Sequence, residues 1–357
     1  MKIATKCWDE SSSSGSKNWH PEKDFKISAE MNKRDRLERT IAGEPTDRVP
    51  VALWRHFPGD DQRAADHANA IMQWQHTFDW DFVNIVPASS FHVVDHGLQD
   101  SWQGDVHGHR AVIRRPIERS LDWTGLRALD PTRGALARQT ECTKIVADEL
   151  SDTVPVIVTI WSPLAQAVAL AGDVTLLNHL RTHADRLHTG LNVLTDSTLR
   201  FLEAIRRLPI SGICYVVNHA CYSALSEAEY RTFGLPYDRK IIESFPTKWW
   251  FNLLNFGEPL PMFHLVDELI TPVVAWRDRE GEPDLSQGRL QVFGAVCGGL
   301  HALEDLHLGT PTRVRDSARD AMSRTNSRRL ILSAGRPVPA LTPYSNLRAA
   351  RMIVEGG

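Results

Sequence analysis

The sequence contains few cysteines and no long apolar run. Its five cysteines stand at positions 7, 142, 214, 221 and 297 and form no CxxC pair. This pattern argues against a disulfide framework and a local zinc knuckle, and it fits a reducing compartment. No apolar stretch reaches the roughly 20 residues of a membrane span, and the first residues lack the apolar core of a secretion signal. We therefore expect a cytoplasmic protein with no membrane partner.

The chain also has little net charge. Its 41 basic and 44 acidic residues give a formal net charge of −3. Binding to nucleic acid or to an anionic membrane generally needs an excess of positive charge. The composition therefore points to a small molecule as the ligand.

The 357 residues divide into a short polar segment and a long patterned one. Residues 1–30 combine a run of four serines with charge and little periodic apolarity, which predicts a disordered extension. The ordered pattern begins at Met31, and residues 31–357 fit one domain, because α/β barrels routinely exceed about 250 residues.

Eight short β-rich segments follow one another along residues 31–357, each followed by a turn or a helical stretch. Eight is the number of strands that closes a parallel (β/α)8 barrel, and we predict this α/β fold, a TIM barrel, with a hairpin insertion from Asp95 to Glu118. In such a barrel the active site lies just past the carboxyl ends of the strands. The segments begin near Arg48, Trp80, Pro155, Ser211, Lys248, Thr271, Leu290 and Arg329.

The end of the first segment carries the densest group of chemical side chains. Arg55 and His56 stand there, followed by Asp60 and Asp61. Arg55 can bind an acidic substrate, while His56 or Asp60 can take part in binding or proton transfer. The structural alternative is that Asp61 caps the next helix and Arg55 pairs with an aspartate.

Polar and aromatic residues also follow the later segments. Trp161 and Trp276 can wall a pocket or serve in packing. The arginines at the mouth, Arg277, Arg279 and Arg336, favour a ligand that carries a carboxylate. The full set of candidate binding residues is Asp60, Trp161, Asn218, Asn255, Trp276 and Arg336, and the candidate catalytic residues are Arg55, His56 and His219.

Three weaker patterns each have a structural interpretation beside the functional one. His92, His96, His107 and His109 stand near Asp95 and could hold a metal, but their spacing matches no defined metal motif and suits a polar surface hairpin equally well. Cys297 could be a nucleophile, although a small buried cysteine is the commoner case. The Gly298-Gly299 pair permits close approach to an anion and is a weak signal by itself.

From Met31 to Gly357 the chain resembles the uroporphyrinogen decarboxylase superfamily. The residues that carry the resemblance are RDRLERTIAGEPTDRVPVALWRHFPGDD, TIWSPLAQAVALAG, LSEAEYRTFGLPYDRKII and LTPYSNLRAARMIVE. The resemblance implies a (β/α)8 barrel and a possible homodimer. It also implies relatives that either decarboxylate the acetate arms of uroporphyrinogen without a cofactor or transfer methyl groups to corrinoid and thiol acceptors with zinc.

Only some of the functional residues of these relatives have a counterpart in this chain. Arg55 matches the first substrate-binding arginine of the decarboxylases, whereas their second arginine falls near Asp60 and their C-terminal histidine at Arg336. Their aspartate falls around residues 87–89, their tyrosine near residues 168–169 and their serine near Ala220. The zinc ligands of the methyltransferases fall at Asn255 to Gly257 and again at Arg336, and neither asparagine nor arginine binds zinc.

These observations support three hypotheses. The first is a cofactor-free and metal-free decarboxylase-like lyase for an acidic, possibly tetrapyrrole, small molecule. This chemistry needs a buried cation and a nearby proton donor, which Arg55 with Arg336 and His56 or His219 could supply. The second is a methyltransferase whose metal ligands have been exchanged for others such as His92, His96 or His219. The third is a barrel that binds a ligand without catalysis.

Overall fold

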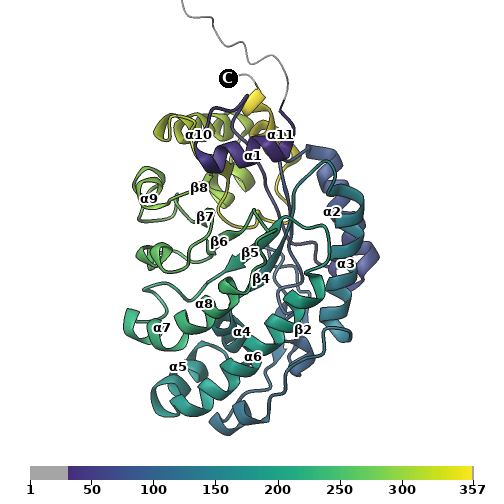
Figure 1. Cartoon of the computed structure of the whole chain (residues 1–357), viewed down its shortest axis with the longest axis vertical. Coiled ribbons are helices and arrows are strands. Elements are labelled where there is room, and N and C mark those ends of the chain that lie inside the picture. Colours follow the sequence, from purple (N-terminus) through teal and green to yellow (C-terminus); the bar gives the residue numbers. More distant parts are fainter. Residues whose placement is uncertain (1–30, 356–357) are drawn as a thin grey trace, which may run out of the picture. The chain divides into compact units, whose positions relative to one another are not determined.

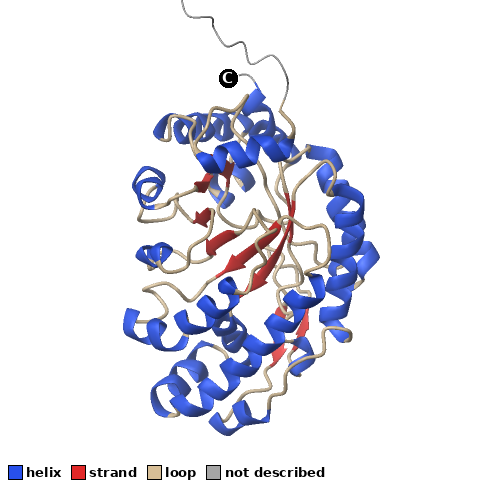
Figure 2. Cartoon of the chain, viewed as in Figure 1, coloured by secondary structure: helices blue, strands red, loops and turns tan. Residues whose placement is uncertain are grey.

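The computed structural model of the protein describes residues 31–355, and the extension predicted for residues 1–30 lies outside this part of the chain. The described segment alternates strands and helices, with the strands inside and the helices outside (Figures 1 and 2). The strands are β1 (Val83–Ile85), β2 (Gln99–Ser101), β3 (Ala111–Arg114), β4 (Val156–Trp161), β5 (Gly212–Val216), β6 (Leu253–Phe256), β7 (Val273–Trp276), β8 (Ala295–Gly299) and β9 (Leu330–Ser333).

Eleven α-helices are present in residues 31–355. They are α1 (Lys33–Ala42), α2 (Ala64–Phe78), α3 (Gly134–Leu150), α4 (Pro163–Ala171), α5 (Asp173–Thr182), α6 (Ala184–Ile205), α7 (Glu227–Phe233), α8 (Leu235–Glu243), α9 (Leu285–Gln291), α10 (Pro311–Arg324) and α11 (Tyr344–Met352). Six single-turn helices, which include η1 (Asp60–Gln62) and η4 (Phe263–Asp267), lie in the connections.

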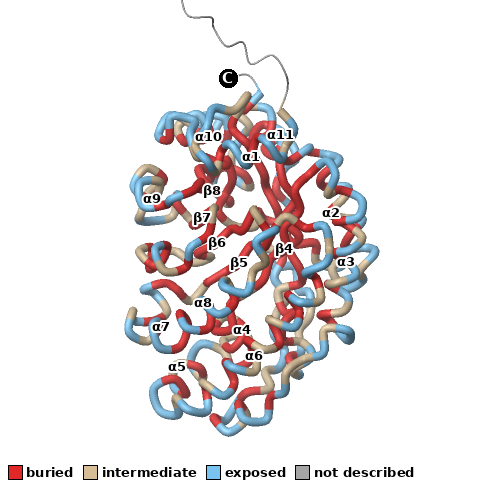
Figure 3. Tube along the Cα trace, viewed as in Figure 1, coloured by how far each residue is buried: buried red, intermediate tan, exposed pale blue. Residues whose placement is uncertain are grey.

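Seven strands form one curled parallel sheet in the order β1-β4-β5-β6-β7-β8-β9. Both faces of this sheet are covered, and its strands read as nearly continuous buried segments, as expected for a parallel sheet (Figure 3). Because the strands are parallel, their carboxyl ends lie along one edge. The predicted hairpin insertion is confirmed as the antiparallel pair β2 and β3.

The predicted set of eight strands is confirmed only in part. The segment that begins near Arg48 forms a single parallel bridge, from Val51 to Leu332 of β9. Its backbone still contacts both ends of the sheet, since Ala52 N donates to Leu332 O at 3.1 Å and Asp81 N donates to Val51 O at 3.0 Å. Pro50 has no N–H, and the N–H of Val51 donates to the Asp81 carboxylate at 2.7 Å, so a regular ladder does not form.

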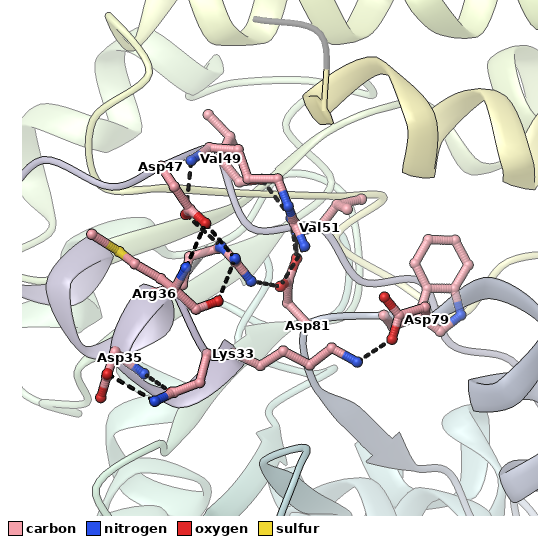
Figure 4. Close-up of polar contacts among 12 residues, drawn as sticks. Lys33, Asp35, Arg36, Asp47, Val49, Val51, Asp79 and Asp81 are labelled. Atoms are coloured by element: carbon pink, nitrogen blue, oxygen red, sulfur yellow. Dashed lines mark hydrogen bonds and ion pairs between the residues drawn. The ribbon is translucent and has the colours of Figure 1, made fainter. Parts of the chain in front are cut away.

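A buried ion-pair network holds this segment in place just before β1 (Figure 4). Asp81 accepts hydrogen bonds from Arg36 at 2.8 Å and from Arg48 at 2.7 and 3.0 Å, in addition to the bond from Val51. Arg36 also binds Asp47 through two nitrogens. The network therefore joins α1, the irregular first segment and the start of β1.

The helix boundaries follow local sequence signals. The predicted capping box of Ser226 and Glu229 starts α7, and Gly43 ends α1 in the left-handed conformation. The strand predicted to begin at Leu290 is wrong in position, because Asp284 and Gln287 form a capping box that starts α9 there. Leu290 lies in that helix, and β8 begins only at Ala295.

Candidate functional site

A cavity of about 280 Å³ lies at the carboxyl ends of β1, β4 and β5, which is where the sequence predicted the site. We call it the first compartment. Its polar wall comes from four sources: residues after β1, residues around the end of β4 and the start of α4, residues after β5, and the residues that flank β3. The polar and aromatic lining residues are Ser89, Ser90, His92, His109, Arg110, Arg115, Trp161, Gln166, Asn218 and His219.

The loop between β2 and β3 covers one side of this mouth. Asp105 accepts hydrogen bonds from the backbone N–H groups of His107 and His109 at 2.9 and 3.1 Å, which shapes the loop tip. Ala340 N donates to Val106 O at 2.8 Å and ties the loop to the segment after β9. Gly108 has φ +84°, and a Cβ there would lie 2.6 Å from Cβ of His56, so only glycine allows this close approach.

His56, a predicted catalytic residue, is buried beneath that loop. Its side chain is adjacent to Trp161, with parallel rings 6.3 Å apart, and to the edge of His109 at 5.2 Å. Nδ1 of His56 lies 3.1 Å from the carbonyl of Pro87, which acts as the acceptor. Burial, with a smaller contribution from the nearby imidazole of His109, lowers the pKa of His56 to about 3. His56 is therefore a neutral donor that fixes the loop after β1.

Three other predicted residues do not line the cavity. The guanidinium of Arg55 lies 4.8 Å from the ring centroids of both Phe57 and Trp74, on the side of α2, and donates to the carbonyl of Ala340. Asp60 is exposed in η1. Trp276 is buried against Phe263, and its Nε1 donates to Pro283 O at 2.7 Å, so its role here is packing.

Asn218 and His219 do line the cavity, and His219 brings one further residue, Asp173, close to the site. Nε2 of His219 lies 3.9 Å from Oδ1 of Asp173, at the start of α5. The nearby imidazole of His219 is the largest influence on Asp173 and lowers the pKa of that carboxyl, with a further lowering by the positive charge of Arg115. The proton-transfer candidate thus has a carboxylate partner.

Arg115 is the cation of the cavity that lacks a carboxylate partner within 4 Å among the described residues. Its guanidinium donates to the backbone carbonyl of Ala169. Arg110, the other arginine of the wall, is 2.7 Å from Asp100. Arg115 is therefore the group best placed to pair with an acidic ligand. Neither Arg115 nor Asp173 was predicted as a site residue. The Arg114-Arg115 pair at the end of the hairpin was the available signal, but the sequence does not show which arginine faces inward.

Arg336 lies beside the mouth in a mixed charge cluster. It is 3.7 Å from Glu280, which also binds Arg277 at 3.2 Å, and Arg277 is 3.3 Å from Glu258. Burial, followed by repulsion from Arg277, lowers the pKa of Arg336. The predicted cationic mouth is thus partly neutralised by glutamates on the same edge.

Asn255 lies inside the sheet on β6, below the cavity wall. It is 3% exposed and belongs to a polar layer with Asn84, Thr159 and Cys214. Thr159 donates to Asn84 at 2.8 Å. Within residues 31–355, Oδ1 of Asn255 is buried without a hydrogen-bond partner.

The residues of the site do not fit the zinc centre that the resemblance implies. Asn255 and Arg336 occupy the expected ligand positions, and neither supplies a zinc-binding lone pair in this setting. Across the described part of the chain, no three His, Cys, Asp or Glu side chains converge in a way that could hold a metal ion. The predicted histidine group is dispersed: His92 is buried against Trp161, whereas His96 lies in a separate surface groove.

The thiol of Cys297 and the glycine pair Gly298-Gly299 lie within β8, and their surroundings indicate a structural role. Cys297 is fully buried, and this burial raises the pKa of its thiol, which disfavours a nucleophilic thiolate. The N–H of Gly299 donates to the buried carboxylate of Asp278 at 3.0 Å. An internal carboxylate therefore occupies the place where the glycine pair was expected to meet an anion.

The curled parallel sheet of seven strands and the cavity at its carboxyl edge define an α/β fold of the half-barrel type. The family model "Uroporphyrinogen decarboxylase (URO-D)" matches residues 68–356, and the chain belongs to this family. No helix in residues 31–355 is long and apolar enough to cross a membrane.

Relatives of two kinds are similar to this chain. A methylcobamide:CoM methyltransferase of Methanosarcina acetivorans is 21% identical over 89% of this chain and 96% of its own length. A uroporphyrinogen decarboxylase of Rhodococcus opacus is 32% identical over 38% of this chain and 39% of its own length. A solved methyltransferase from Methanosarcina mazei shares the fold with a TM-score of 0.80 at 16% identity, covering 91% of this chain and 99% of that one.

Proposed function

We propose that the protein is a carboxy-lyase that acts, without a metal, on a small molecule bearing more than one carboxylate. The observation that carries the proposal is that Arg115 and His219 line one cavity on the carboxyl edge of the sheet, with the carboxylate of Asp173 3.9 Å from His219. Arg115 would anchor one carboxylate through charge-assisted hydrogen bonds. His219, with Asp173 beside it, would transfer protons.

The proposed reaction replaces an acetate carboxylate on an electron-rich ring by hydrogen. Protonated His219 adds a proton to a ring carbon, and the ring becomes an electron sink. The electrons of the bond between the methylene and the carboxylate then move toward the ring as CO2 leaves. A proton next adds to the exocyclic carbon, and the ring gives up the proton that it took.

The size of the first compartment by itself fits a group smaller than a tetrapyrrole. Its volume of about 280 Å³ lies at the low end of ligand pockets, which span roughly 300–1,000 Å³. Trp161 and Val168 supply flat and apolar wall. A single ring with carboxylate side chains matches this space and chemistry.

The direct test is CO2 release from a pyrrole that carries an acetic and a propionic acid side chain, labelled in the acetate carboxyl, with uroporphyrinogen assayed in parallel. Chelator-treated protein is expected to release labelled CO2 from the single-ring acid. Absence of release from both acids would overturn the proposal.

One observation favours a second candidate, methyl transfer: the methylcobamide:CoM methyltransferase is similar over nearly its whole length. Methyl transfer from methylcobamide to a thiol, measured together with bound zinc, tests this candidate. Metal-dependent transfer without CO2 release would support it in place of the lyase.

A further inference from the structure

A second compartment adjoins the first on the far side of His219. It has a volume of about 380 Å³ and shares Val168, Asn218 and His219 with the first compartment. Asn218 and His219 follow β5, and Val168 belongs to α4. These residues border both spaces, so His219 stands between the two compartments, within reach of a ligand that contacts both.

The two compartments carry opposite charge. The lining of the first includes Arg110 and Arg115 and no carboxylate, whereas the lining of the second includes Asp173 and Glu258 and no arginine or lysine. Arg110 is paired with Asp100 and Glu258 with Arg277, so among the described residues Arg115 is the lining cation without a carboxylate partner, and Asp173 is the lining carboxylate without an arginine or lysine partner. The space is therefore polarised along its length.

The side chains that line the second compartment indicate which chemical group it can bind. Apolar side chains form most of its surface, and they are Val168, Leu176, Leu177, Ala224 and Leu225. Asp173 is exposed and Glu258 is partly exposed, with 76% and 43% of their side-chain surfaces accessible. Glu258 has Arg277 as a partner at 3.3 Å, but Arg277 does not line the compartment. An alkyl chain that ends in an ammonium group matches apolar walls with carboxylates at the rim.

We propose that the substrate is a zwitterion whose carboxylate pairs with Arg115 and whose alkylammonium group enters the second compartment beside Asp173 and Glu258. This inference rests on the proposed function only in assigning the carboxylate to Arg115. The same charges disfavour molecules with acid groups at every edge, because a carboxylate in the second compartment would face two others. The polarised cavity thus selects against a polyacidic tetrapyrrole.

Binding of matched probes tests this inference without requiring turnover. The probes are straight-chain ω-amino acids of increasing length, the corresponding acids without the amine, and the corresponding amines without the acid, each titrated by calorimetry. One ω-amino acid of suitable length is expected to bind at least about tenfold more tightly than both of its single-charge counterparts, since one charge-assisted contact contributes about 1.5–3 kcal/mol.

Two variants separate the role of Glu258 from a general change in charge. Glu258→Gln is expected to remove most of the advantage of the amino acid over the plain acid. Glu280→Gln is the matched control, because it also removes one carboxylate partner of Arg277 but lines neither compartment. It should leave the advantage intact.

The possible results are distinguishable. Equal affinity of amino acid and plain acid at every length would overturn the zwitterion, as would simultaneous, independent binding of the plain acid and the plain amine. Preferred binding of the amino acid without CO2 release from any substrate would retain this inference and contradict the carboxy-lyase.

Discussion

Arg115 is the residue on which ligand recognition depends in this account. The variant Arg115→Gln removes the one cavity arginine that has no carboxylate partner in the described chain, and kcat/KM for an acidic substrate should fall about 10- to 100-fold. Arg114→Gln is the matched control, because Arg114 is the exposed neighbour on β3 and does not line the cavity. Steady-state kinetics on both variants make the comparison, and equal losses would show a nonspecific effect of charge.

His219 carries the proton transfer in this account. His219→Gln keeps a polar side chain in the wall but cannot act as an acid or base, so kcat should fall about 10²- to 10⁴-fold. The affinity of the amino acid probe, measured by calorimetry, should change much less than kcat. A variant with wild-type kcat would remove His219 from the mechanism.

The sequence allowed some of these residues to be predicted and not others. Asn218, His219 and Trp161 were found because they follow strands, and this position alone places a side chain at the carboxyl edge. Position after a strand does not specify the direction of a side chain, and the guanidinium of Arg55 therefore turned out to lie over Phe57 and Trp74. Arg115 was missed because it comes from the hairpin insertion, whose path over the mouth depends on tertiary contacts such as Ala340 with Val106.

The hairpin of β2 and β3 is the element that covers the mouth, and its glycines offer a matched pair of variants. Gly108 and Gly104 have similar φ values of +84° and +82°, but a Cβ at residue 104 meets nothing within 4 Å. Gly104→Ala should therefore cost only the backbone strain, about 1 kcal/mol, whereas Gly108→Ala adds a clash with His56. Urea unfolding and ligand affinity should both show the larger loss for Gly108→Ala, and equal effects would mean that the loop does not rest on His56.

The first predicted strand shows how local chemistry can override a β-rich pattern. Its residues are apolar and buried like those of a strand, and this pattern was correctly detected. Pro50 and the carboxylate of Asp81 nevertheless divert its hydrogen bonds. A partner 30 residues away in sequence decides this outcome, and periodicity within the segment cannot reveal it.

The buried network around Asp81 should contribute far more to the free energy of unfolding than a neighbouring surface ion pair does. Asp81→Asn leaves two buried guanidinium groups short of charge compensation, and the free energy of unfolding should fall by about 3–5 kcal/mol. Asp79→Asn is the control: Asp79 pairs with Lys33 and Arg351 but is 61% exposed, so the expected cost is about 0–1 kcal/mol. Urea midpoints measure both, and similar losses would contradict the role given to the buried network.

For the whole molecule, buried titratable groups predict how stability depends on pH. Burial is the main cause that lowers the pKa of His56 and His92 to about 3 and of His67 to about 4. Burial also raises the pKa of Asp238 to about 6 and of Asp278 to about 7. The histidines are neutral in the folded protein at pH values where the unfolded chain protonates them, and the aspartates show the reverse behaviour.

The direction in which stability changes with pH follows from the number of protons that each state binds between roughly pH 4 and 6. In this window the unfolded state holds protons on the three histidines, while the folded state holds protons on the two aspartates. The unfolded state therefore binds one proton more than the folded state. Stability should therefore rise by about 1.4 kcal/mol per pH unit in this window from these five groups. His67→Gln should flatten this slope and Asp238→Asn should steepen it in urea unfolding across the window, and unchanged slopes would contradict the assigned protonation states.

The central claim is that the cavity at the carboxyl edge removes CO2 from an acidic ring compound with its own side chains. The most direct measurement is release of labelled CO2 from the acetate-labelled pyrrole by chelator-treated protein, with Arg115→Gln and Arg114→Gln assayed in parallel. The account predicts release by the wild type and by Arg114→Gln, and a loss of at least about tenfold in Arg115→Gln. No release by the wild type, or release that Arg115→Gln leaves unchanged, would contradict it.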